Sequence, residues 1–254
     1  MIKNYFITVN YNTSSLIDNW IDNIREHAIN SEIVIVDNYS TEEELQNVVE
    51  ICIKKSVHLI ESSNVGYGRG LNKAIKYSIE KENNVAFNIY AGNLDVSFSN
   101  IPTDLPSGKY VYIPEIKEKN RLNRNPFLTE LQKYILPLYY LSGFLQSSLL
   151  LSMTTGVNKL VGYFPSKIWA IHGSMFCFNS TILQEKTIFN DNSFLYCEEL
   201  EFASFIESNN IKYITTNIRL EHFGQVATGN INTSKKKFLK LWWPSFENWS
   251  NRWK

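Results

Sequence analysis

The sequence predicts an α/β protein with a mainly parallel sheet flanked by helices. Up to residue 91, four apolar runs of strand length alternate with three segments whose apolar residues recur at helical spacing. Such an alternation is typical of parallel strands joined by crossover helices. The second run, 32–37, is apolar on both faces, as expected for a strand covered from both sides. A chain of 254 residues can bury the core that this fold requires.

Local signals place the elements of the first hundred residues. The expected strands are rich in β-branched and aromatic residues. Ser14 or Ser15 can cap the first helix, and Thr41 with Glu44 forms a capping box that opens the second. The expected strands are 5–11, 32–37, 57–61 and 85–91, and the expected helices are 16–28, 42–55 and 71–81.

The rest of the chain is less regular. An apolar insertion covers about 127–160, and from 134 to 158 it contains no charged residue. That length would cross a bilayer, but Pro137, Gly143 and Gln146 dilute it, which favours a pair of helices facing the core or a membrane. The other elements expected are strands at 110–116, 170–178 and 211–215, a polar loop at 117–127 and a helix at 194–207.

Composition argues against several classes of protein. Lys+Arg and Asp+Glu are both 25, so the whole chain has no electrostatic footprint for nucleic acid. The three cysteines, Cys52, Cys177 and Cys197, form no CxxC pair, which argues against a disulfide framework or a cysteine zinc site. The first residues lack the apolar core and cleavage site of a signal peptide, so we expect a cytoplasmic protein.

Asn93-Leu94-Asp95 is the most informative tripeptide. It follows the expected strand 85–91, and a carboxylate at the C-terminal end of a central strand lies where open α/β sheets bind ligands. An Asn-x-Asp at that position suggests a divalent metal that holds a diphosphate.

Two further strand ends carry candidate ligand-binding loops. After the third strand, the stretch 64–72 (NVGYGRGLN) has glycines that let the backbone approach a ligand, before a helix N-terminus that favours phosphate. Its G-x-G-x-G spacing fits a dinucleotide fingerprint poorly, and a plain turn is the alternative. Asp37-Asn38 ends the second strand, where a carboxylate can accept from uracil or thymine N3–H, or simply form a turn into the helix.

Acidic residues and a histidine complete the candidate chemistry. Glu198, Glu199 and Glu201 lie among aromatic residues, where a desolvated carboxylate has a raised pKa and suits a general base. The alternative is ordinary acid enrichment in the first turn of a helix. His222 follows the last strand and could share an ion with Asp95, although a lone histidine is more often structural.

Taken in order, these motifs resemble the family-two inverting glycosyltransferases of GT-A fold, particularly the bacterial rhamnosyltransferase-like branch. The resemblance covers about residues 3–230. The motifs that carry it are ITVNYN (7–12), IVIVDNYST (33–41), NVGYGRGLN (64–72), NLD (93–95), HGSMFCFN (172–179), FLYCEELEF (194–202) and EHFG (221–224).

The resemblance implies a role for each matching position. Gly173 would lie in the loop that shapes the acceptor side, Glu199 would be the catalytic base, and Glu198 would be its backup. Asp95 would bind Mg²⁺ or Mn²⁺, joined by His222. The donor would be contacted by Thr8, Val9, Asn10 and Asp37 at the base, by Asn64, Gly66 and Arg69 at the nucleoside or phosphate, and by Asn93.

The implied reaction is a single displacement that inverts the anomeric centre of a dTDP- or UDP-sugar. Four positions depart from the family pattern: Leu94 replaces proline, Glu199 and Glu201 replace aspartates, and Phe205 replaces an arginine. Two alternatives therefore stay open, a non-catalytic nucleotide-sugar-binding protein and a sugar-phosphate nucleotidyltransferase.

The predicted organisation is a GT-A domain over 1–230, with a nucleotide-sugar-binding half at 1–100, an acceptor half at 101–230 and a tail at 231–254. From residue 235 the tail has six basic residues, one acid and four tryptophans, which suits an anionic membrane surface. The alternative is a helix that docks its aromatic residues on the core. With the uncharged insertion, the tail favours a peripheral protein at the inner face of the cytoplasmic membrane. Its acceptor would be an undecaprenyl-diphosphate-linked glycan of lipopolysaccharide O-antigen or capsule synthesis.

Overall fold

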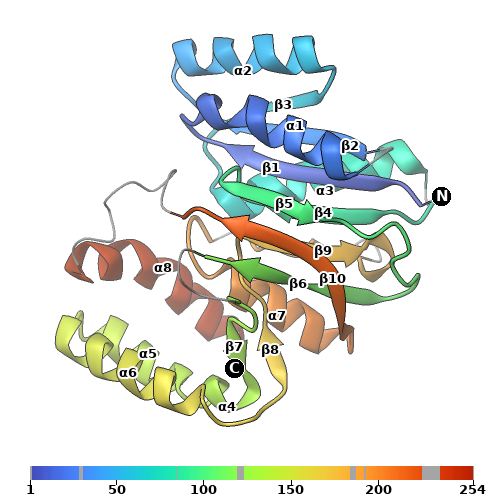
Figure 1. Cartoon of the computed structure of the whole chain (residues 1–254). Helices are drawn as coiled ribbons and strands as arrows, with labels where there is room; N and C mark the ends of the chain where they lie inside the picture. Colours follow the sequence, from blue (N-terminus) through green and yellow to red (C-terminus); the bar gives the residue numbers. More distant parts are fainter. Residues whose placement is uncertain are drawn as a thin grey trace.

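The computed structural model describes residues 2–28, 31–83, 85–118, 123–183, 187–191, 193–224 and 235–253. Within them lies an eight-stranded sheet with β9 antiparallel to both its neighbours, β5 antiparallel to β10, and all other neighbours parallel. This confirms the predicted α/β class with a mainly parallel sheet (Figure 1). In spatial order the strands are β3 (His58–Ser62), β2 (Ser31–Asn38), β1 (Asn4–Asn10), β4 (Asn88–Gly92), β9 (Met175–Asn179), β6 (Tyr110–Lys117), β10 (Lys212–His222) and β5 (Val96–Asn100).

The first half of the chain follows the predicted alternation. The Thr41 side chain caps the second helix as expected, while the Glu44 carboxylate accepts a hydrogen bond from the Ser14 amide. The third helix begins at Tyr67 rather than 71, because its glycines Gly68 and Gly70 are weak helix formers that the sequence pattern assigns to a loop. The elements are the 3-10 turn η1 (Ser14–Leu16), α1 (Ile17–His27), α2 (Glu42–Lys55) and α3 (Tyr67–Glu82).

The second half differs from the prediction at three strands. The single strand expected at 170–178 is two, β8 (Ile168–Ala170) and β9, because a turn with His172 and Gly173 interrupts them. β10 continues to His222, beyond the expected 211–215, and its alternating exposed polar residues conceal the strand in sequence. β5 was not among the predicted strands, and its five residues directly follow Asp95. The helix expected at 194–207 is α7 (Glu198–Ser208).

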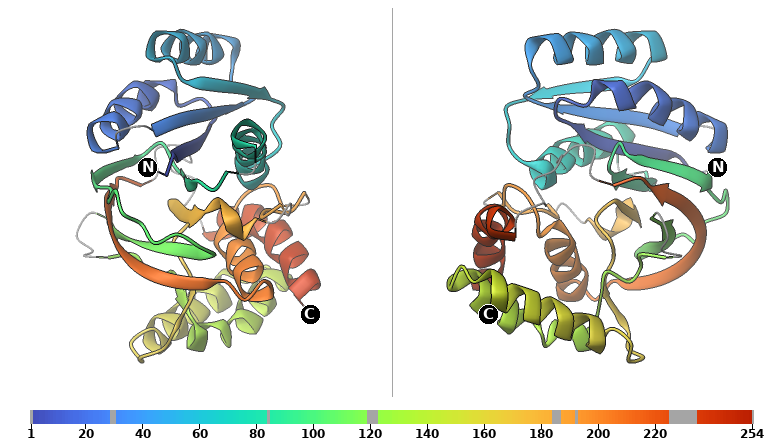
Figure 2. Two further views of the ribbon diagram at one scale, coloured as in Figure 1. Left: turned by 90° about the vertical axis from the view of Figure 1, so that its right-hand side faces the viewer. Right: turned by 60° about the vertical axis from the view of Figure 1, so that its left-hand side comes forward.

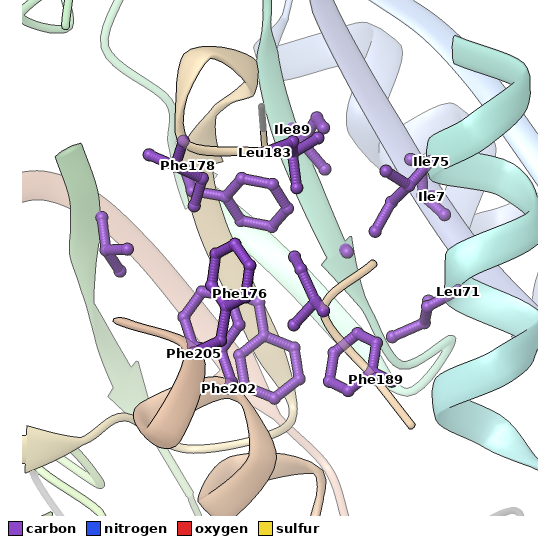
Figure 3. Packing of buried hydrophobic residues seen from close by; sticks show 14 of the residues in the cluster. Ile7, Leu71, Ile75, Ile89, Phe176, Phe178, Leu183, Phe189, Phe202 and Phe205 are labelled. Carbon is purple, nitrogen blue, oxygen red and sulfur yellow. The ribbon is translucent and has the colours of Figure 1, made fainter. Parts of the chain in front are cut away.

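Two apolar clusters lie on opposite faces of the sheet, and Figure 2 shows α1 and α3 on either side of the strands. One contains residues of α1 and α2. The other joins both halves of the chain: Phe176 and Phe178 of β9 meet Phe202 of α7, with ring centroids 4.6 and 5.6 Å apart. Figure 3 shows this cluster continuing to Leu71 on α3. The first hundred residues and the acid-bearing helix therefore share one core.

The apolar insertion forms helices, and the tail docks on them. Trp242 and Trp249 of the tail helix are 8% and 4% exposed in a third cluster, which also contains Leu200 of α7. These two tryptophans are core residues. For them the structure agrees with the alternative prediction, a C-terminal helix that docks its aromatic residues on the core. None of the described helices is long and apolar enough to cross a membrane. The elements are β7 (Leu128–Thr129), which pairs with β8, α4 (Glu130–Lys133), α5 (Leu136–Phe144), α6 (Ser148–Val161), the 3-10 turn η2 (Ser180–Ile182) and α8 (Lys235–Trp253).

Candidate active site

Sheet pairing brings Asp95 and His222 together from distant parts of the chain. Asp95 lies between β4 and β5, and β5 pairs with the end of β10 so that Val96 is opposite His222. The Asp95 Oδ1 atom is 3.3 Å from the His222 Nε2 atom, and both residues are 8% exposed. The pair that the sequence proposed as metal ligands is therefore adjacent.

Glu118 and Arg124 lie behind the histidine. β6 runs parallel to β10 with Lys117 opposite Glu221, so Glu118 comes next to His222. The Glu118 Oε1 atom is 3.3 Å from His222 Nδ1, and its Oε2 atom is 3.2 Å from Arg124 Nε. The Nδ1 atom is buried without a hydrogen-bond partner in the described part of the chain, so Glu118 acts on it as a nearby negative charge. A proton on Nδ1 would leave the Nε2 lone pair facing Asp95.

This donor set fits a hexacoordinate divalent cation. Ligands about 2.1 Å from Mg²⁺ at right angles are about 3 Å apart, close to the separation of Asp95 Oδ1 and His222 Nε2. Within the described ranges no group of three or more His, Cys, Asp or Glu side chains forms a metal site. Two protein ligands suit an ion that takes the rest from substrate phosphates and water, as Mg²⁺ commonly does.

The acids Glu198 and Glu199 open α7 after a strained turn. Tyr196 and Cys197 have φ of 65° and 77°, a left-handed conformation that is costly for residues with a side chain and is often found at functional sites. Burial, together with the neighbouring Glu199, raises the pKa of Glu198 to about 8. Burial also raises the pKa of Glu199, although the Gly173 backbone and Arg124 oppose that shift.

Gly173 lies so close to Glu199 that a side chain at position 173 would have no room. A Cβ atom at Gly173 would lie 2.5 Å from Glu199 Oε1, so any larger residue would displace that carboxylate. The turn that carries Gly173 is also fastened to the metal-side tripeptide, because the Asn93 amide donates to the Ser174 carbonyl over 2.9 Å. The predicted acceptor loop therefore connects Asn93 to Glu199.

Asp37 and Asn10 lie together at the ends of β2 and β1. Asp37 accepts three hydrogen bonds, from the Asn10 amide group, the Ser40 backbone and the Ser40 hydroxyl. A carboxylate has about four lone-pair sites, so one remains for a base. The Thr8 hydroxyl is buried and without a hydrogen-bond partner in the described part of the chain. Contact of these residues with a nucleotide base stays a prediction.

The glycine-bearing loop touches the acid-bearing segment. The Tyr67 amide donates to the Phe194 carbonyl, and a Cβ atom on Gly66, whose φ is +91°, would lie 2.2 Å from that oxygen. Asn64 accepts from the Asn38 side chain, and the Arg69 side chain donates to the loop's own Val65 carbonyl. Val9, predicted at the base, packs under Gly70, where a Cβ atom would lie 2.8 Å from its Cγ2 atom.

Four site residues escaped the sequence interpretation: Tyr67, Glu118, Arg124 and His172. The Tyr67 hydroxyl is buried without a hydrogen-bond partner among the residues described, and burial, then Glu198, Asp95 and Glu199, raise its pKa well above the usual range. It is thus a protonated donor close to all three acids. Arg124 and Glu118 fall in the stretch assigned to a polar loop. The pairing of β6 with β10 places Glu118, and Arg124 is placed by its ion pair with Glu118 and by its guanidinium group 3.4 Å from His172 Nε2. The His172 ring in turn lies 5.6 Å from the His222 ring. Leu94, which replaces the proline of the family pattern, is 8% exposed and packs in the core.

Comparisons with known proteins bear on the fold and on the first third of the chain. Residues 5–87 match the family model described as Glycosyl transferase family 2, a range that ends before Asp95. No curated protein matches the sequence.

Three solved structures have a similar fold. S. aureus TarS 1-349 in complex with UDP matches with a TM-score of 0.55 and 14% identity, over 94% of this chain and 64% of that chain. Glucosyl-3-phosphoglycerate synthase from Mycobacterium tuberculosis, in complex with Mn²⁺, UDP and glucosyl-3-phosphoglycerate, matches with a TM-score of 0.53 and 12% identity. The match covers 94% of this chain and 77% of that chain. The mannosyltransferase PcManGT from Pyrobaculum calidifontis, in complex with GDP-Man and Mn²⁺, matches with a TM-score of 0.50 and 15% identity. The match covers 87% of this chain and 56% of that chain.

The chain spans 60 to 64% of the two TarS 1-349 chains that it matches. The family model covers the motifs of the first three strands, and the similarity in fold extends over 87 to 94% of the chain. As the motifs predict, residues 5–87 match glycosyl transferase family 2, and the chain has the GT-A fold.

Proposed function

We propose that this chain is a metal-dependent inverting glycosyltransferase that moves a sugar from a dTDP- or UDP-sugar to an acceptor hydroxyl. The observation that carries the proposal is that the turn with His172 and Gly173 meets both sets of groups. The His172 ring lies 5.6 Å from the His222 ring, on the metal side, and Gly173 lies against the Glu199 carboxylate, on the acid side. A leaving-group site and a base are thus within one centre.

Each side chain has a task in this reaction. Asp95 and His222 would hold Mg²⁺ or Mn²⁺, which when bound neutralises charge that develops on the leaving diphosphate. Tyr67 keeps its proton and can donate a hydrogen bond to an oxygen in the site. A carboxylate on the other side accepts the proton of the attacking hydroxyl as the new bond forms, and one displacement inverts the anomeric carbon.

Glu199 is the better candidate for the base. With a pKa of about 8, Glu198 holds its proton in most molecules at neutral pH. Glu199 has the Gly173 backbone and Arg124 to stabilise its ionised form, and the contact with Gly173 directs it to the predicted acceptor loop. Glu198 then acts chiefly by fixing the start of α7.

The similar structures support a nucleotide-sugar donor and a divalent metal, but not a particular nucleotide. Two of them contain UDP and two contain Mn²⁺, whereas PcManGT binds GDP-Man, so the nucleotide must be measured. A lipid-linked acceptor, such as an undecaprenyl-diphosphate glycan of O-antigen or capsule synthesis, is proposed from the uncharged insertion. A peripheral position at the cytoplasmic membrane follows from that acceptor, and the resemblance to the rhamnosyltransferase-like branch does not name the sugar.

Release of nucleoside diphosphate from a panel of UDP-, dTDP- and GDP-sugars with Mn²⁺ tests the proposal. We expect release from one nucleotide class, an at least 100-fold loss in Asp95→Ala, and a comparable loss in Glu199→Gln. Full activity in either variant removes the role assigned to that residue. Donor binding without release from any sugar, with a membrane fraction added as acceptor source, would favour the non-catalytic binding protein instead.

A further inference from the structure

The pair of helices α5 and α6 exposes an unusual number of large apolar side chains. On α6, Leu149, Met153 and Leu160 are 71%, 61% and 64% exposed. Next to the helices, Phe144 and Leu145 end α5, and Tyr163 and Phe164 follow α6. We call the following set the apolar face: Leu138, Leu141, Phe144, Leu145, Leu149, Met153, Val157, Leu160, Tyr163 and Phe164.

The apolar face follows helical geometry. Positions 149, 153, 157 and 160 are separated by four, four and three residues, so they form one stripe along α6. On α6 the buried residues are Leu151 and Thr154, which face the third cluster and α5. α6 therefore has apolar residues on its outer side as well as on its inner side, whereas an ordinary surface helix has a polar outer side. Contiguous exposed apolar surface of this kind marks an interaction site.

A basic border lies alongside the apolar face. The first turns of α8 carry exposed Lys235, Lys236, Lys237 and Lys240, and no acid is present in the first turn. The Lys235 ammonium group donates to the Ser152 hydroxyl on α6 over 2.6 Å, which places this border beside the stripe. Figure 1 shows α5, α6 and α8 together, at the end of the molecule opposite α2.

We propose that the apolar face inserts into the headgroup region of an anionic bilayer, with the α8 lysines on the lipid phosphates. Apolar and aromatic residues bordered by lysine are the composition that anionic membrane interfaces recruit. A symmetric second copy would bring the same lysines towards one another, whereas anionic lipid neutralises them. The charge of the border thus favours lipid over a dimer.

This location deepens the proposed function, on which it rests for the acceptor. Leu200 and Ala203 of α7 pack in the same cluster as Trp242 of α8 and Leu136 of α5. The helix that carries Glu199 therefore shares a core with the helices of the apolar face, and α8 packs against α7 as well as against α5 and α6. A hydroxyl on a lipid-linked glycan would reach the base from the membrane side.

Vesicle flotation of the full chain tests the proposal. We expect flotation with phosphatidylglycerol-containing vesicles and at least 10-fold less with neutral phosphatidylcholine vesicles. The triple variant Leu149→Gln, Met153→Gln, Leu160→Gln should lose flotation at least 10-fold. Ile53→Gln is the matched control, because Ile53 is 74% exposed on α2, far from the apolar face, and should float like the wild type. Lys236→Gln with Lys237→Gln should weaken binding to anionic vesicles only.

Equal flotation of the triple variant and the wild type would overturn the proposal. So would a concentration-dependent dimer in sedimentation that the triple variant abolishes, because a second copy would then cover the face. Nucleoside diphosphate release from a soluble donor separates the two proposals. Release of nucleoside diphosphate should persist in the triple variant. If flotation is lost while release is intact, the substitutions have affected membrane binding alone.

Discussion

At the residue scale, the proposed metal ligands have a carboxylate behind them. The Glu118 Oε1 atom lies 3.3 Å from His222 Nδ1, where its charge would favour a proton, and His222 Nε2 lies 3.3 Å from Asp95 Oδ1. Residues in this position typically change metal affinity 10- to 100-fold when they are replaced. We therefore expect Glu118→Gln to weaken Mn²⁺ binding by about 10- to 100-fold in calorimetry, without nucleotide.

Glu115→Gln is the control for that measurement. Glu115 lies on β6, just before Glu118, but pairs with Arg219, which is more than half exposed. Its replacement should leave Mn²⁺ affinity unchanged. Equal affinity in the wild type and in Glu118→Gln would show that Glu118 does not orient the histidine.

Glu198 gives a pH prediction for stability. Its pKa is about 8 in the folded chain and 4.5 when unperturbed, so between these values the folded state binds more protons than the unfolded state. Its contribution to stability is present in full below pH 4.5 and is lost as the pH rises towards 8. Glu198→Gln should therefore flatten the decline of the melting temperature across this range. An unchanged slope would contradict the buried, protonated state of Glu198.

At the element scale, the attachment of α8 depends on a glycine. A Cβ atom at Gly143 of α5 would lie 1.9 Å from the Trp243 ring of α8. Overpacking of this kind costs about 1–3 kcal/mol, so Gly143→Ala should lower the free energy of unfolding by that amount. A Cβ atom at Gly156 of α6 would meet nothing within 4 Å, so Gly156→Ala should be neutral or stabilising by up to about 1 kcal/mol.

Urea denaturation of the two variants measures both effects. The comparison is matched because each change adds one methyl group to a helix of the same insertion. Equal stability of Gly143→Ala and Gly156→Ala would mean that α8 does not pack on α5 as described.

The individual elements also show which parts of the fold could be predicted from the sequence. β1 to β4 were predictable because buried strands and their helices have clear periodicities and caps. β5 was not, since its alternation of Val96 and Phe98 with serines covers only five residues and follows a strand directly. The docking of α8 depends on packing against α5 and α7, and basic, tryptophan-rich composition is equally typical of membrane segments and of docked helices.

At the scale of the whole molecule, topology assembles the site. The order of strands places the end of β4 against the turn before β9, and the pairing of β5 with β10 adds His222. Asp95, Glu199 and His222 could be proposed from motifs because each follows or opens an element in the order of the family. Tyr67, Glu118 and Arg124 could not, because their proximity to the acids arises only from long-range pairing.

The central claim is that Asp95 and His222 hold a metal that holds the diphosphate of the donor. Calorimetric titration with UDP, dTDP and GDP, with and without Mn²⁺, tests it without an acceptor. We predict that one nucleoside diphosphate binds preferentially, that Mn²⁺ strengthens its binding at least 10-fold, and that Asp95→Ala removes the strengthening. Binding of the same affinity without metal, or an unchanged response to Mn²⁺ in Asp95→Ala, would contradict the account.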